Sequence, residues 1–152
     1  MLTDVCLRRG AFSHLPADRG GSTKFGLTQT TVTPMTGADI QTLTLEEACT
    51  IYHVLYVMRP GLDRLPPAIQ PFLTDMALHS GPFIAIAGLQ EVCDLTPDGV
   101  LNPMTIAAAY ATSRLTDLIK WRLLMLTRIV RRDPTQLPML TTWTAHVLDF
   151  LA

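Results

Sequence analysis

The segment from Arg8 to Gln29 concentrates the residue types that could do chemistry. Asp18 offers a carboxylate and Thr23 a hydroxyl, in a loop-like stretch with glycines at positions 10, 20, 21 and 26. Glycines allow positive φ and close backbone approach, which suits a site loop and a tight turn alike. Asp18 and Thr23 therefore either supply a basic or charge-stabilising group or cap loop amides, as Asp and Thr commonly do. Arg9 precedes them, and we expect its guanidinium to pair with Asp18 rather than leave that carboxylate as a nucleophile.

Short elements must position this segment. The apolar spacing predicts a short helix at residues 3–9, ended by Gly10. The glycines predict a tight hairpin over Asp18–Phe25, with its positive-φ turn in the Arg-Gly-Gly-Ser sequence. A helical turn is predicted at residues 27–33, stopped by Pro34, and a loop at residues 35–43.

The rest of the chain has the pattern of helices. Thr44 and Glu47 have the spacing of a capping box, which predicts a helix from Leu45 to about Met58. Apolar residues at helical spacing, together with prolines and glycines at the boundaries, predict further helices at residues 66–80, 82–93, 103–111, 114–132 and 137–151. The sequence therefore predicts a mainly α fold with one small Gly-rich β-hairpin near the N-terminus.

Composition limits the class of protein. The 152 residues, 48% hydrophobic and 16% charged, predict a single globular domain over residues 1–152. A net charge of −1 argues against nucleic-acid binding that relies on overall basicity. No apolar run approaches the length of a membrane span, so we expect no stable membrane insertion. The first residues lack the pattern of an ordinary signal peptide, which predicts synthesis in the cytoplasm, with a periplasmic or cell-wall target reached after export or release.

Cysteines and histidines are spread along the chain. Cys6, Cys49 and Cys93 lie in apolar sequence and are interpreted as small buried hydrophobes rather than a disulfide framework. No CxxC or HExxH pattern occurs, and His14, His53, His79 and His146 are far apart. These observations predict neither a metal site nor a cofactor.

The Gly-rich segment resembles the signature of glycoside hydrolase family 108, the lysozyme-like N-acetylmuramidases of phage and bacterial cell lysis. The matching residues are Gly10, Phe12, Pro16, Asp18, Gly20, Gly21, Thr23, Phe25, Gly26, Leu27, Thr28 and Gln29. The resemblance continues through Leu43–Tyr56, Asp75–Pro82, Leu89–Gln90 and Asp98–Thr105. It implies a lysozyme-like α+β domain with a muramidase-like part at about residues 1–81 and a helical, peptidoglycan-binding-like part at about residues 82–152.

The chain departs from the family pattern mainly at positions expected to take part in catalysis or binding, and less at positions that hold the fold. Arg9 stands where the family has its catalytic glutamate, Val57 where a tryptophan is usual, and His79 where an asparagine is usual. Ala11 and Asn102 replace glycines. The resemblance implies that Asp18 and Thr23 are retained catalytic positions. It places Phe12, Phe25, Gln29, His79 and Gln90 at substrate-binding positions.

Cleavage of a glycosidic bond requires a carboxylic acid to protonate the leaving oxygen, and arginine does not release its proton at usable pH. The sequence therefore favours a pseudo-muramidase that binds peptidoglycan or a partner protein without turnover. A second hypothesis is an active endolysin-type hydrolase that uses an unusual acid. A third is an interaction or assembly module, with the basic helix Arg114–Arg132 and the seven methionines at a protein interface.

Overall fold

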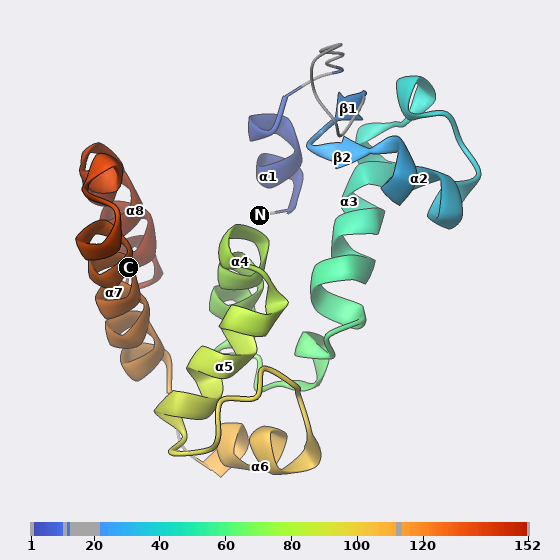
Figure 1. Cartoon of the computed structure of the whole chain (residues 1–152). Coiled ribbons are helices and arrows are strands. Elements are labelled where there is room, and N and C mark those ends of the chain that lie inside the picture. Colours follow the sequence, from blue (N-terminus) through green and yellow to red (C-terminus); the bar gives the residue numbers. More distant parts are fainter. Residues whose placement is uncertain (1, 11, 13–21, 112–113, 152) are drawn as a thin grey trace. The chain divides into compact units, whose positions relative to one another are not determined.

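The computed structural model describes residues 2–10, 12, 22–111 and 114–151 (Figure 1). Two compact units divide the chain, Met1–Arg59 and Pro60–Ala152. The boundary of these units falls between Arg59 and Pro60. Helices α4 (Gln70–Ser80) and α5 (Pro82–Val92) pack against each other on either side of Gly81 within the second unit. The predicted mainly α fold with a small hairpin near the N-terminus is confirmed.

The first unit builds a small hairpin and two short helices around helix α3. Its elements are α1 (Leu2–Arg8), β1 (Thr23–Lys24), β2 (Leu27–Thr28), α2 (Gln29–Thr36), the 3-10 turn Ile40–Thr42, α3 (Leu45–His53) and the π-helical turn Val54–Met58. The strands are antiparallel, with Thr23 opposite Thr28 and Lys24 opposite Leu27. Helix α1 packs on α3, and Cys6 and Tyr52 are buried there.

The hairpin turn differs from its prediction. Phe25 and Gly26 form it, with φ of 52° and 75°, the left-handed pair that two-residue hairpins favour. The sequence placed the turn in the Arg-Gly-Gly-Ser stretch, and Asp18–Gly21 lie outside the described residues. A second difference concerns Pro34, which lies inside α2; that helix ends instead at Gly37, where φ is 70°.

The capping box is confirmed. The Thr44 hydroxyl accepts from the Glu47 amide at 3.2 Å, and the Glu47 carboxylate accepts from the Thr44 amide at 2.8 Å. Two orphan N–H groups are thereby satisfied, which fixes where α3 begins. Its buried residues Ala48, Ile51 and Tyr52 follow helical spacing and form the core of the first unit.

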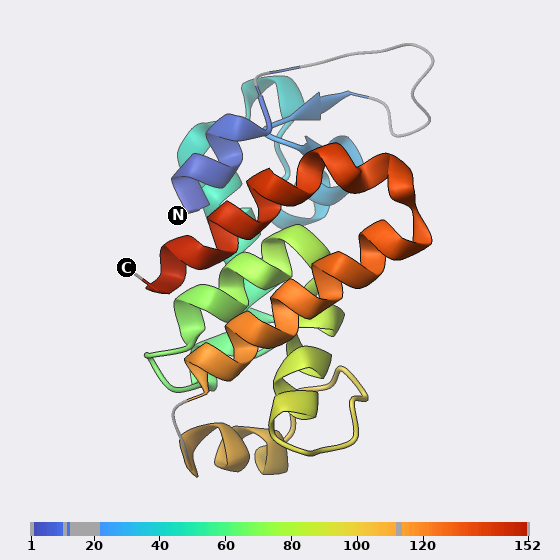
Figure 2. The ribbon, with the colours of Figure 1, turned by 90° about the vertical axis from the view of Figure 1, so that its left-hand side faces the viewer.

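The second unit is entirely helical in its described part. Besides α4 and α5 it contains the 3-10 turn Leu62–Arg64, α6 (Pro103–Ala111), α7 (Leu115–Arg132), the 3-10 turn Pro134–Gln136, α8 (Leu137–Leu148) and the 3-10 turn Asp149–Leu151. Helices α7 and α8 lie side by side, joined at Asp133–Gln136 (Figure 2). Buried Phe72, Met76, Leu89 and Leu118 come from α4, α5 and α7. No helix in the described ranges combines the length and apolarity that a membrane span needs.

Candidate functional site

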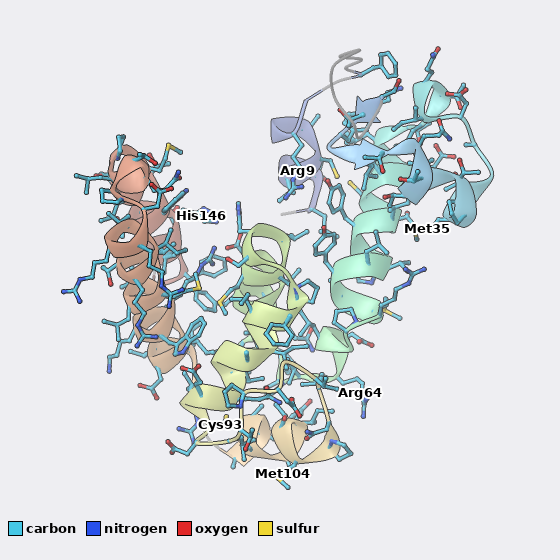
Figure 3. The ribbon with its side chains drawn as sticks, viewed as in Figure 1. Arg9, Met35, Arg64, Cys93, Met104 and His146 are labelled. Atoms are coloured by element: carbon cyan, nitrogen blue, oxygen red, sulfur yellow. The ribbon has the colours of Figure 1, made fainter. Side chains whose placement is uncertain are left out.

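Arg9 lies at the end of α1, directly above an aromatic ring. Its amide donates to the Val5 carbonyl at 3.1 Å, the i→i−4 bond of an α-helix, so Arg9 directly follows the last helical residue, Arg8. Its guanidinium Cζ lies 5.4 Å from the centroid of the Tyr52 ring on α3. Arg9 is labelled in Figure 3. Tyr52 is buried while Arg9 is exposed, so the pair presents a solvent-facing cation on an aromatic face.

The hairpin turn is fixed to the same tyrosine. The Tyr52 hydroxyl donates to the Phe25 carbonyl at 2.9 Å, and the Phe25 amide donates to the Gly10 carbonyl at 2.9 Å. A Cβ added at Gly26 would lie 2.6 Å from Arg9 Cδ and 3.0 Å from the Tyr52 oxygen. Gly26 therefore permits both the turn and the close approach of the arginine. We call Arg9, Phe25, Gly26 and Tyr52 the Arg9 cluster.

Burial raises the pKa of Tyr52, and the Arg9 cation opposes that rise. The phenol therefore stays protonated and donates its hydrogen bond over the physiological pH range. The Arg9 cluster offers a permanent cation, an aromatic ring and a neutral phenol. Such a set can bind an anion or an acidic polymer, but its guanidinium cannot act as a general acid.

Asp18 and Thr23, the two positions predicted to be catalytic, differ in how far the structure describes them. Thr23 is half-buried in β1, where it pairs with Thr28 across the hairpin. Asp18 lies outside the described residues. Phe12 is 40% exposed, whereas Phe25 is half-buried in the turn. Of the first unit's predicted site residues, Arg9 and Phe25 are the two that the structure shows at one cluster.

Gln29 holds a loop. Its amide nitrogen donates to the Ala38 carbonyl at 3.1 Å, and its amide oxygen accepts from the Ile40 amide at 2.8 Å. The side chain thereby pins the segment after α2 to the start of that helix. Both ends of the amide thus have a structural role, and the predicted substrate contact of Gln29 stays a prediction.

Gln90 is 1% exposed and has a similar role in the second unit. Its nitrogen lies 2.7 Å from the Asp98 carboxylate and 3.2 Å from the Thr105 hydroxyl, and its oxygen accepts from the Gly99 amide at 2.9 Å. A cavity of about 230 Å³ adjoins this turn, lined by Gln90, Asp94, Leu95, Thr96, Asp98, Asn102, Met104 and Thr105. Gln90 thus both positions and lines the cavity wall, and its contact with substrate stays a prediction.

His79 faces a buried carboxylate on its own helix. Its Nε2 lies 3.5 Å from Oδ1 of Asp75, one turn earlier on α4. The same carboxylate accepts from Arg122 Nη1 at 2.6 Å and contacts His146 Nε2 at 2.9 Å. We call these four residues the Asp75 cluster. Sequence reasoning missed Arg122 and His146, although an arginine between Leu118 and Leu126 on the apolar stripe of α7 was a usable signal.

The carboxylates with shifted pKa values do not resemble a general acid. Hydrogen bonds lower the pKa of Glu47, through Thr44, and that of Asp98, through Val100 and Gln90. The pKa of Asp133 is lowered by bonds from Thr135, and that of Asp75 is also lowered. An acid that works near neutral pH needs a raised pKa. These four groups are therefore unsuited to protonating a leaving oxygen.

Comparisons with known proteins define the class. The chain is similar over 97% of its length to SagA of Brucella abortus, at 28% sequence identity and a TM-score of 0.71, covering 87% of that chain. A search of curated proteins found no match. The mainly helical architecture with its small hairpin is thus a lysozyme-like fold.

The family follows from a second comparison. The model of the glycosyl hydrolase 108 family matches residues 2–81, which is more than half of the chain. This protein therefore belongs to the glycosyl hydrolase 108 family.

Proposed function

We propose that this protein is a lysozyme-like domain that binds peptidoglycan without cleaving it. One observation carries the proposal: a guanidinium, held over Tyr52, occupies the position at which the family resemblance places the catalytic carboxylic acid. The contacts of Arg9 with Tyr52 and Gly26 support a side chain that is held at this position by its neighbours rather than directed away from them.

The chemistry of glycoside hydrolysis supports the loss of turnover. The leaving oxygen must receive a proton in the transition state, and this step contributes about 10²–10⁴-fold to the rate. Arginine stays protonated at every usable pH, so it has no proton to give. The lowered pKa values of Glu47, Asp75, Asp98 and Asp133 argue against substitution by those carboxylates.

The same residues support binding. Peptidoglycan carries free carboxylates on its peptide stems, and a guanidinium pairs with carboxylates through two parallel hydrogen bonds. Arg9 is exposed, and the Tyr52 ring beneath it restricts the orientations of its guanidinium. Pre-ordering of this kind lowers the entropy cost of binding.

Co-sedimentation with purified sacculi tests the binding half of the proposal. The wild-type protein should sediment with the sacculi, and Arg9→Ala should weaken binding by about tenfold, since it removes one charge-assisted contact. Arg128→Ala is the matched control, because it removes an exposed arginine from α7 in the second unit. Equal sedimentation of wild type and Arg9→Ala, or capture by a protein partner but not by sacculi, would overturn the assignment of peptidoglycan as ligand.

A further inference from the structure

The Asp75 cluster brings two histidines to one carboxylate in the second unit. Asp75 and His79 lie one turn apart on α4, so they share a helix face. His146 extends from α8 toward α4 (Figure 3). The sequence predicted no metal site because these histidines are far apart in the chain, but folding places them together.

We propose that Asp75, His79 and His146 form a binding site for a divalent transition-metal ion of the zinc type. Each residue offers one ligand atom, and the three atoms lie within 4.8 Å of one another. Imidazole nitrogen and carboxylate oxygen are the donors that zinc takes in sites with an open fourth position.

The distances between donor atoms suit a tetrahedral ion. Oδ1 of Asp75 lies 2.9 Å from Nε2 of His146 and 3.5 Å from Nε2 of His79. Ligand atoms at about 2.0–2.1 Å from a tetrahedral zinc ion stand about 3.3 Å apart. The two rings, with centroids 5.2 Å apart and planes at 66°, can close on an ion by small side-chain rotations.

Arg122 prepares the carboxylate for this role. Its Nη1 binds Oδ2 of Asp75 at 2.6 Å, which leaves Oδ1 facing the histidines. Burial alone would raise the pKa of Asp75, but hydrogen bonds from His79, Arg122 and His146 together hold it well below its ordinary value. The carboxylate is therefore ionised, as a metal ligand must be, and Arg122 orients it as outer-shell partners do.

The site is reachable from solvent. The side chains of His79 and His146 are 46% and 32% exposed, whereas those of Asp75 and Arg122 are almost fully buried. An ion can thus enter from the histidine side, and water can take the fourth position. A bound ion would tie α8 to α4 through three ligand bonds, one from His146 on α8 and two from Asp75 and His79 on α4.

Calorimetric titration of the full chain with Zn²⁺ tests the proposal. We expect one ion per chain, a thermal midpoint that rises with Zn²⁺, and visible absorption bands of a tetrahedral site when Co²⁺ is used instead. His79→Asn and His146→Gln should each weaken binding by about tenfold or more, as loss of one of three ligands requires. His53→Gln is the control, because it removes an exposed histidine from α3.

The histidine variants are chosen because both ligands are partly exposed, so folding can be verified by circular dichroism before titration. Zn²⁺ affinity unchanged in His79→Asn and His146→Gln would overturn the proposal. Binding that His53→Gln abolishes, or Co²⁺ bands of an octahedral aqua ion only, would overturn it as well. None of these results depends on peptidoglycan binding, so the two proposals fail independently.

Discussion

The guanidinium of Arg9 lies over the ring of Tyr52, with Cζ 5.4 Å from the ring centroid. This relationship joins the end of α1 to α3, and the Tyr52 hydroxyl then joins α3 to the hairpin turn through the Phe25 carbonyl. One buried tyrosine therefore positions both the arginine and the turn. The residue at position 9 is thus held by the fold, and its type determines what the Arg9 cluster can do.

Arg9→Glu should introduce muramidase activity into a protein that we propose has none. A glutamate there would stand beside a buried aromatic ring, the kind of setting that raises a carboxyl pKa. Release of reducing ends from sacculi measures the gain, and Arg9→Gln controls for loss of the cation alone. Activity in Arg9→Gln equal to that in Arg9→Glu would contradict this role of the acid, and no gain in either would contradict the expectation that position 9 alone silences the site.

Gly26→Ala should destabilise the protein by about 1–3 kcal/mol, because a left-handed φ and a steric clash act together. The added Cβ would meet Arg9 Cδ at 2.6 Å. Gly37→Ala is the matched control, with a φ of 70° and nothing within 4 Å of its Cβ. Urea unfolding of both variants measures the difference. A smaller loss for Gly26→Ala than for Gly37→Ala would contradict the close packing of Arg9 on the turn.

Arg122→Leu should lower the free energy of unfolding by about 3–5 kcal/mol, since it leaves the buried Asp75 carboxylate without its cation. Arg122 is 4% exposed and contacts Oδ2 of Asp75 at 2.6 Å. The double variant Arg122→Leu with Asp75→Asn should recover part of the loss, because no buried charge then remains. Urea unfolding with a chelator present measures both, and a loss below about 1 kcal/mol, the range of surface ion pairs, would disprove the buried pairing.

Mild oxidation should join Cys6 and Cys49 in a disulfide. Their sulfur atoms lie 3.6 Å apart, between α1 and α3, although the sequence predicted no disulfide framework. With oxidised glutathione, Cys49 first forms a mixed disulfide, and Cys6 then attacks it and releases glutathione. Mass spectrometry without reductant should find the loss of two hydrogens in the wild type and in Cys93→Ser, but not in Cys49→Ser.

The rate of this oxidation should rise with pH. Burial raises the pKa of Cys6 to about 12, so its thiolate, the attacking form, is scarce at neutral pH. The thiolate fraction grows roughly tenfold for each pH unit below that pKa. A closure rate that levels off near pH 9, as expected for a thiol with the ordinary pKa of about 8.5, would contradict the raised pKa of Cys6.

Local signals made much of the fold predictable. The capping box of Thr44 and Glu47, which spans four residues, identified where α3 begins. Gly81 and Pro82 identified the boundary between α4 and α5. The hairpin turn was predicted too early in the sequence because Phe25 adopts a positive φ. Positive φ is uncommon for non-glycine residues, so the residue type gave no sign of a turn there.

The site was less predictable because its contacts are long-range. The resemblance identified position 9 and Phe25, but nothing local indicated that Tyr52 would lie beneath Arg9. Likewise, Asp75 meets Arg122 and His146 only after α7 and α8 fold back onto α4. Gln29 and Gln90 matched substrate-binding positions by sequence, whereas their amides hold loops.

The proposed loss of turnover is tested most directly by incubating purified sacculi with a large excess of the wild-type protein and measuring soluble reducing ends. Because Arg9 has no proton to give to the leaving oxygen, we predict no release above the level of heat-inactivated protein. Reducing ends released by the wild type, and lost in Asp18→Ala, would show an active muramidase and contradict this account.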